Sequence, residues 1–148
     1  MAGQFEATTE VDRPIDEVFA FLAAGTNDPK FSPRVQEITK TPDGPTAVGT
    51  VFTSTVKDAG MKTGRQFRIT AFEAPHRIRW AEISKNVVTA DEGGYDLEST
   101  GEGTTRVRIF NVLEGHGIGK LLVGFALSAA RKDADAFGRR IKAAVEAS

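Results

Sequence analysis

Four polar residues stand inside otherwise apolar, regularly patterned stretches of the sequence: Glu82, Tyr95, Asn111 and Asp133. A carboxyl group surrounded by apolar side chains has a raised pKa and can act as a general base near neutral pH. Glu82 or Asp133 could therefore remove an acidic proton next to a carbonyl group. Tyr95 or Asn111 could donate a hydrogen bond to the enolate that develops. This set predicts proton-abstraction chemistry without a covalent nucleophile.

Each of the four residues also has a purely structural explanation. Glu82 can lie in solvent beyond the edge of a cavity, and Asp133 can lie at a rim where it reaches water or bonds a strand arginine. Tyr95 can direct its hydroxyl group to water. Asn111 can satisfy a backbone group near a bulge. The sequence leaves both explanations open for all four.

Other chemistries lack the residues that they need. The 148-residue chain has no cysteine, which excludes thiolate catalysis and cysteine-held metals, and it has only two histidines, His76 and His116. We therefore expect no metal and no cofactor. His116 is interpreted either as an exposed loop residue or as a residue at the mouth of a site, because glycines flank it. A net charge of -1 offers no basic excess for nucleic acid.

A long amphipathic helix is predicted for residues 117–147, and it is the element that the other elements must surround. Its apolar positions recur at helical spacing along one side, which we expect to pack on the rest of the protein. Asp133 interrupts this side near its middle. The apolar side comprises Ile118, Leu122, Phe125, Ala126, Ala129, Ala130, Phe137, Ile141 and Ala144.

Upstream of this helix the pattern is mainly that of strands. Residues 5–11 alternate as a first strand, a short helix begins at Pro14, and residues 27–31 form a capped single turn. Gly93-Gly94 inside a strand predicts a bulge or a sharp bend. Six further strands are separated by short turns, at residues 35–41, 46–57, 62–73, 77–84, 88–100 and 105–114.

This order of elements predicts a single α+β domain over residues 1–148. The expected architecture is a curved, seven-stranded antiparallel sheet wrapped around the C-terminal helix, with two short helices between strands 1 and 2. Alternation then assigns one face of each strand to the helix; Phe67, Ile69 and Ala71, for example, share that face. We expect a ligand in the space between to contact Phe31, Phe52, Phe67, Ile69, Trp80, Tyr95, Leu97, Ile109, Asn111, Leu122, Phe125, Ala129 and Asp133.

Five segments in this order and spacing, which together extend over almost the whole chain, carry a family resemblance: residues 11–19, 48–50, 71–78, 103–107 and 137–146. The chain resembles the START-like, helix-grip superfamily (Bet v 1-like, SRPBCC) and, within it, the polyketide cyclase/dehydrase and lipid-transport group. Members often carry a tryptophan where this chain has Phe31-Ser32-Pro33; its sole tryptophan is Trp80.

The resemblance implies a hydrophobic cavity that binds a small apolar or amphipathic molecule, such as a lipid, a polyketide or a related metabolite. A cyclase or dehydratase with a cavity carboxylate as general base is the alternative, and a protein interaction module is the second alternative. We expect no membrane span, a cytoplasmic location and a monomer or weak homodimer.

Overall fold

Seven antiparallel strands form one open sheet in the computed structural model, which describes residues 2–58 and 60–148. The strand order is β1-β7-β6-β5-β4-β3-β2, so consecutive hairpins join β2 to β7 and the first strand lies beside the last. The strands are β1 (Ala2–Val11), β2 (Val35–Thr41), β3 (Val51–Asp58), β4 (Met61–Glu73), β5 (Arg77–Glu82), β6 (Val88–Gly101) and β7 (Thr104–Gly115).

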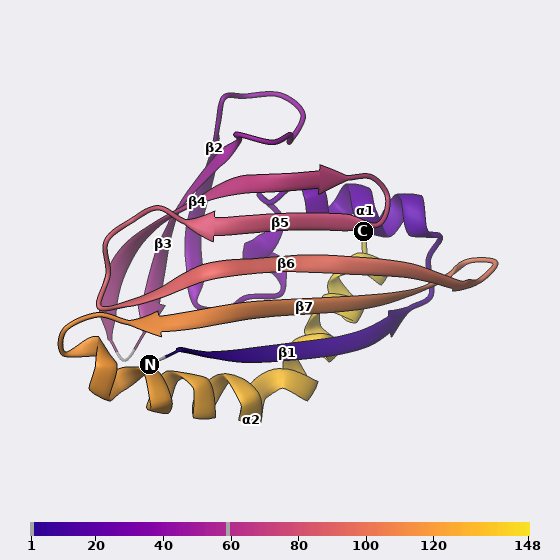
Figure 1. Cartoon of the computed structure of the whole chain (residues 1–148). Coiled ribbons are helices and arrows are strands. Elements are labelled where there is room, and N and C mark those ends of the chain that lie inside the picture. The colour runs from indigo at the N-terminus through magenta and orange to yellow at the C-terminus, as the bar shows by residue number, and fades with distance from the viewer. Residues whose placement is uncertain (1, 59) are drawn as a thin grey trace.

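Three helical segments complete the fold: α1 (Ile15–Ala23), η1 (Asp28–Lys30) and α2 (Gly119–Glu146). The predicted α+β fold is confirmed, with a long C-terminal helix and with α1 and the single 3-10 turn η1 between β1 and β2. β3 and β2 run steeply across the direction of β5, β6 and β7, which gives the sheet its curvature (Figure 1). α2 packs mainly against β1 and β7.

Two strand assignments from the sequence are wrong in detail. The strand predicted from residue 46 begins at Val51, because Thr50 N–H donates to Ala47 O in a turn and Gly49 has a positive φ of 94°. In β4, the register with β5 shifts between Ile69 and Ala71. This bulge turns Ala71 away from the helix side and places Phe72 there instead, edge-to-face with Phe19 at a centroid distance of 5.2 Å.

The outer face of the sheet carries one buried aromatic ring, Phe110. The guanidinium groups of Arg79 and Arg108 lie 4.9 Å and 4.6 Å from its ring centroid. Asp96 accepts a hydrogen bond from each arginine, at 2.8 Å and 2.9 Å. Gly94 makes room for Arg79, since a Cβ there would lie 2.7 Å from Arg79 Nη1. Cation–π contacts thus cover an apolar ring on the solvent side.

Candidate functional site

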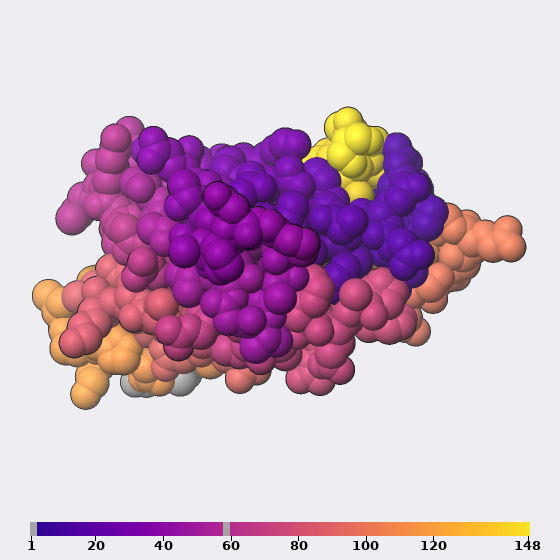
Figure 2. Space-filling model, turned by 90° about the horizontal axis from the view of Figure 1, so that it is seen from above, coloured from indigo at the N-terminus to yellow at the C-terminus, as the bar shows by residue number. Residues whose placement is uncertain are grey.

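The inner face of the sheet, which is the face towards α2, is fully buried at one end. Val11, Leu97 and Val107 from three strands belong to the same core cluster as Ile141 and Val145 of α2. Gly138 brings the helix close to β1, because a Cβ there would lie 3.2 Å from Thr8 O. The last turns of α2 lie beside α1 at this end of the molecule (Figure 2). We call this region the packed end.

Towards the other end, inward-facing side chains keep accessible surface. Phe5 and Asn111 are cross-strand partners on this face, and both are only half-buried. Leu122 of α2 is 43% exposed and lies on the same side of the helix as Phe137, which contacts Phe31 in the interior. Inward-facing side chains in this region are therefore less completely covered than those at the packed end. We call this region the open end; its residues are Phe5, Phe67, Trp80, Asn111, Leu113 and Leu122.

Trp80 and Asn111 are joined across Gly93 at the open end. The three residues pair in one row of the sheet, and Trp80 Nε1 donates to Asn111 Oδ1 at 2.9 Å. A Cβ at Gly93 would lie 2.1 Å from that oxygen, so glycine leaves the space that the bond occupies. The bulge predicted at Gly93-Gly94 lies earlier, between Ala90 and Glu92. In the described part of the chain, the Asn111 amide NH₂ has no hydrogen-bond partner and can donate to a ligand.

Tyr95 is buried beside this pair, with its ring edge-to-face on Trp80 at 5.1 Å. Burial raises the pKa of the Tyr95 phenol well above its usual range, and the nearby charge of Asp28 raises that pKa further. The phenol therefore stays protonated and can donate a hydrogen bond. Asp28, at the start of η1, is thus close enough to act electrostatically on the inner face.

The carboxyl group of Asp28 was not among the residues predicted from the sequence. Burial raises its pKa from 3.8 to about 7, although the residue keeps part of its surface accessible. Asn-Asp-Pro is typical of a capped turn, yet η1 has no side-chain cap. The N-cap residue is Asn27, whose side chain donates to Phe21 O at 2.9 Å instead of capping η1.

Glu82 has a different environment from the one predicted for a general base. Its side chain is fully buried, so it does not lie in solvent, and it is 2.9 Å from Arg65 Nη1. Its carboxylate also accepts hydrogen bonds from Ser84, Asn86 and the backbone N–H of Ala90. These donors occupy both oxygens. Arg65 also donates to the carbonyl oxygen of Val88. Together with the bond from Ala90 N–H to Glu82, this contact holds the β6 backbone beyond the last β5–β6 pair, which is Trp80 and Gly93.

Asp133 pairs with an arginine of its own helix. Arg140 Nη2 and Nη1 lie 2.7 Å and 3.3 Å from the two carboxylate oxygens. The hydrogen bonds from Arg140 lower the pKa of Asp133, which is opposite to the direction expected of a base in a dry cavity. Arg140 also donates to Phe31 O at 3.0 Å. This pair therefore ties α2 to the segment after η1.

The apolar side predicted for α2 is wrong in its first half. Ile118 and Phe125 were expected to pack on the sheet, but they are 65% and 77% exposed, and Ala129 is exposed as well. Val123 and Leu127 are buried in their place. The helix carries two apolar stripes here, and the one through Val123 and Leu127 packs on the sheet.

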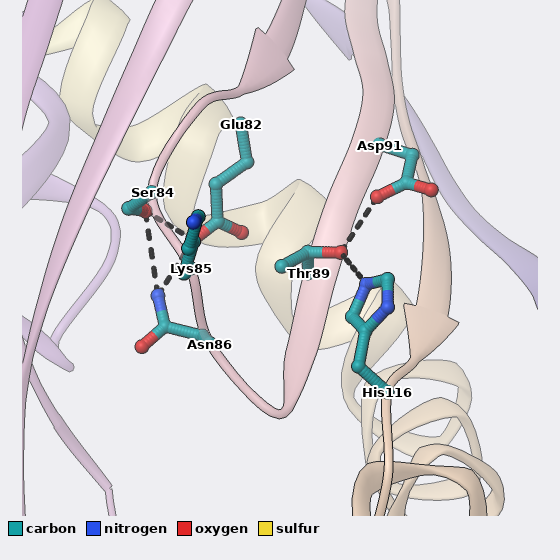
Figure 3. Close-up of a pocket in the computed structure, with 7 residues that line it drawn as sticks. All are labelled: Glu82, Ser84, Lys85, Asn86, Thr89, Asp91 and His116. Carbon is teal, nitrogen blue, oxygen red and sulfur yellow. Dashed lines mark hydrogen bonds between the residues drawn. The ribbon is translucent and has the colours of Figure 1, made fainter.

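A pocket of about 400 Å³ opens beside Glu82, where His116 lies (Figure 3). Thr89 Oγ1 lies 2.6 Å from Asp91 Oδ1 and 2.8 Å from His116 Nε2. A carboxylate only accepts, so the Thr89 hydroxyl donates to Asp91 and His116 Nε2 donates to Thr89. Two bonded groups, Glu82-Ser84-Asn86 and Asp91-Thr89-His116, face each other across this pocket (Figure 3). Its lining is polar, unlike that of the open end.

Residues 2–146 match the family model described as polyketide cyclase / dehydrase and lipid transport. The chain belongs to this family. A search of curated proteins found no match to this sequence. Among the described residues, no helix is long and apolar enough to span a membrane.

Solved structures share the fold of this family member at low sequence identity. The Zhui aromatase/cyclase from Streptomyces sp. R1128 matches with a TM-score of 0.78 and 16% identity over 99% of this chain and 94% of its own. A START superfamily protein from Mycobacterium smegmatis matches at 0.70 and 14%, over 97% of each chain. Ara h 8.0201 matches at 0.68 and 16%, over 100% of each chain. Together with the family model, these matches in fold confirm the predicted resemblance.

The structure divides the expected ligand contacts of this family member into three groups by exposure. Phe31, Phe52, Ile69, Tyr95, Leu97 and Ile109 are buried. Phe67, Trp80, Asn111 and Asp133 are half-buried, and Leu122, Phe125 and Ala129 are exposed. The half-buried and exposed groups keep accessible surface, whereas the buried group lies among core side chains.

Proposed function

We propose that the protein binds a small molecule with an apolar body and one hydrogen-bond acceptor at the open end. The observation that carries the proposal is the contrast along the inner face, where side chains are closed off at one end and remain accessible at the other. An apolar surface with few polar groups is typical of small-molecule sites. The family description, which names lipid transport beside cyclase and dehydrase chemistry, supports this class of ligand.

Phe67 and Trp80 offer flat apolar surface to the body of the ligand. The Asn111 amide is held by Trp80 and donates to the ligand's acceptor. Leu122 covers the ligand from α2. Displacing water from these apolar surfaces contributes about 25 cal/mol per Å² that is buried.

The sole tryptophan makes dye binding directly measurable, because all tryptophan emission comes from Trp80 at the open end and the matched variants below locate the dye. We expect 8-anilinonaphthalene-1-sulfonate to bind with saturation and to quench Trp80 by energy transfer. Leu122→Asp is expected to weaken binding about tenfold, since it places a charge on the apolar wall. Leu121→Asp is the matched control, because Leu121 is 75% exposed on the neighbouring side of the same turn.

Equal affinity of the wild-type protein and both variants would locate the probe elsewhere and contradict the proposed site. The absence of any saturable binding would contradict the function itself.

The family description also includes enzymes, and a reaction of cyclase or dehydratase type is the second candidate function. Such a reaction needs a group that accepts a proton. Glu82 and Asp133 both hold arginine partners, whereas Asp28 has an interior position and a pKa near neutral pH. Asp28 is the observation that favours this candidate.

A further inference from the structure

Large apolar side chains that remain exposed gather at one end of the molecule. Of the eight such residues within 2–58 and 60–148, only Val48 lies elsewhere, in the loop between β2 and β3 that projects at the top of Figure 1. The other seven lie at the start of β4, in the β5–β6 loop and from residue 118 through the first two turns of α2. Besides Leu122 of the open end, they are Met61, Ile83, Val87, Ile118, Leu121 and Phe125.

The segments that carry these residues are joined to one another. The backbone N–H of His116, just before α2, donates to Val87 O in the β5–β6 loop at 2.8 Å. α2 begins directly on this loop, because a Cβ at Gly119 would lie 1.6 Å from the same oxygen. Asn86 ties the loop to β4, since its side chain donates to Gly64 O at 3.3 Å. Figure 1 and Figure 2 both show the start of β4, the β5–β6 loop and the start of α2 at the left end of the molecule. We call the surface formed by the seven residues the apolar tip.

Four exposed lysines stand among the side chains of the apolar tip. Lys62 follows Met61, and Lys57 is the cross-strand partner of Lys62 in the β3–β4 hairpin. Lys85 lies in the β5–β6 loop, and Lys120 lies in the first turn of α2. Across residues 2–58 and 60–148, the ammonium groups of these lysines form no ion pair and no hydrogen bond. The tip therefore combines apolar surface with unpaired positive charge.

Three of these cations occupy positions that disfavour the folded protein. Lys57 and Lys62 lie directly opposite each other on neighbouring strands, where like charges repel. Lys120 lies at the positive end of the α2 dipole, and the first turn of α2 contains no acidic residue. An external anionic surface would turn each of these unfavourable placements into a favourable one.

The residue types at the apolar tip match a lipid surface better than a protein partner. Protein interfaces are depleted of lysine and enriched in arginine and aromatic residues. Here the nearby arginine, Arg65, is held by Glu82 at 2.9 Å, and Asp91 beside the β5–β6 loop accepts a hydrogen bond from Thr89. Five of the seven apolar residues are isoleucine, leucine or valine. A lysine can lay its aliphatic stem along such side chains while its ammonium group reaches a headgroup phosphate.

We propose that the apolar tip docks on the surface of a lipid bilayer that carries anionic headgroups. Leu121 and Phe125, which are 75% and 77% exposed, enter the boundary between headgroups and acyl chains, and the four lysines contact the phosphates. These two side chains lie on the side of α2 opposite to buried Val123, so they point away from the sheet. The docking surface is therefore separate from the inward-facing residues of the proposed function and does not depend on them.

Flotation of the full-length protein with unilamellar vesicles tests this docking. We expect binding to vesicles of phosphatidylcholine with phosphatidylserine, and at least tenfold weaker binding to phosphatidylcholine alone. Binding should fall as sodium chloride is raised from about 0.05 to about 0.5 M. Leu121→Asp should weaken binding at least tenfold, because it places a charge in the apolar surface. Val48→Asp is the matched control, since Val48 is 63% exposed but lies outside the tip, and its binding should equal that of the wild-type protein.

A second pair of variants tests the lysines. Lys120→Glu should weaken binding to the anionic vesicles about tenfold. Arg139→Glu changes the net charge by the same amount at an exposed position about five turns further along the same helix, and should change binding less than twofold. Equal losses in both variants would show a response to net charge alone and would overturn the assignment to the tip.

The proposal is also overturned if the wild-type protein does not bind the anionic vesicles, or if Leu121→Asp binds them as well as the wild-type protein does. A dimer in analytical ultracentrifugation that Leu121→Asp dissociates, without vesicle binding, would instead assign the tip to a second copy of the chain. Binding of 8-anilinonaphthalene-1-sulfonate without vesicles separates the two proposals. A protein that docks on vesicles but does not bind the dye keeps the docking surface and loses the proposed function, and the reverse result does the opposite.

Discussion

The two halves of α2 differ in how far their apolar side chains are buried. In the C-terminal half, Ile141 and Val145 are buried against the sheet core. In the N-terminal half, Val123 and Leu127 pack on the sheet while Ile118 and Phe125 stay exposed. The same helix thus carries one stripe that builds the core and a second that nothing in the described chain covers. The buried side chains of α2 therefore contribute most at the packed end, and the proposed ligand site lies at the less covered half.

The largest predicted loss of stability comes from a substitution at the packed end. Ile141→Ala removes buried methyl groups from the centre of the core and should lower the free energy of unfolding by about 2–5 kcal/mol. Chemical denaturation measures this loss. Dye binding per folded molecule should be unchanged, because the open end keeps its residues. A loss below about 1 kcal/mol would mean that the packed end does not dominate stability.

Asp28→Asn should stabilise the protein at pH 8, whereas Ile141→Ala destabilises it. The folded-state pKa of about 7 lies above the ordinary value of 3.8, so the folded state binds the proton more tightly. The wild-type protein therefore loses stability as pH rises from about 4 to 7, and the variant does not. We expect the variant to gain about 1–2 kcal/mol in the free energy of unfolding at pH 8 and little at pH 4. This gain is smaller than the pKa shift of Asp28 alone would give, because Asp28 is partly accessible and asparagine is also polar. Equal stability curves against pH would contradict the interior placement of Asp28.

Gly93→Ala tests the contact between Trp80 and Asn111 at the open end. The added Cβ would meet Asn111 Oδ1 and Trp80 Nε1, so the bond between these side chains must break or the strand must shift. We expect a loss of about 1–2 kcal/mol in stability and a red shift of Trp80 emission. Gly64→Ala in β4, two strands away in the sheet, is the control, because a Cβ there meets nothing within 4 Å. A variant with unchanged emission would show that Gly93 is not needed for this contact.

Phe125→Ser should have the smallest effect on stability. Phe125 is 77% exposed, so its removal should change the free energy of unfolding by less than about 0.5 kcal/mol. Thermal unfolding measures the difference from the wild-type protein. A loss above about 2 kcal/mol would show that this stripe is covered in solution, and the contrast between the two halves of α2 would then not hold.

The strand pattern could be predicted well because alternation and turn residues act locally. Val35–Thr41 was predicted to the residue, and β6 and β7 to within one residue at each end. The face of Ala71 could not be predicted, because the bulge at Thr70 depends on pairing with β5 and leaves no mark in the β4 sequence. The orientation of α2 was missed for a related reason, since two apolar stripes fit the same helical period and only the sheet selects between them.

The site was harder to predict than the fold. Trp80 and Asn111 were recognised as inward-facing residues, but their hydrogen bond depends on Gly93 of a third strand. Glu82 and Asp133 were recognised as carboxylates in apolar stretches, but their arginine partners come from positions that periodicity does not connect to them. The sequence predicts a capped single turn at residues 27–31 and gives no indication that the Asp28 carboxyl group is poorly hydrated. In each case the missing information is a partner that is distant in sequence.

The strand order also has a consequence for biosynthesis. β2 to β7 pair with their sequence neighbours, so each hairpin can close as it leaves the ribosome. β1 leaves first but pairs with β7, which is nearly last, and α2 follows later still to cover both. The N-terminal strand therefore waits with Phe5 and Ala7 uncovered for most of synthesis. We expect closure of this long-range pair to be the slow, aggregation-exposed step of assembly, and a chaperone that binds short apolar segments would find a target in β1.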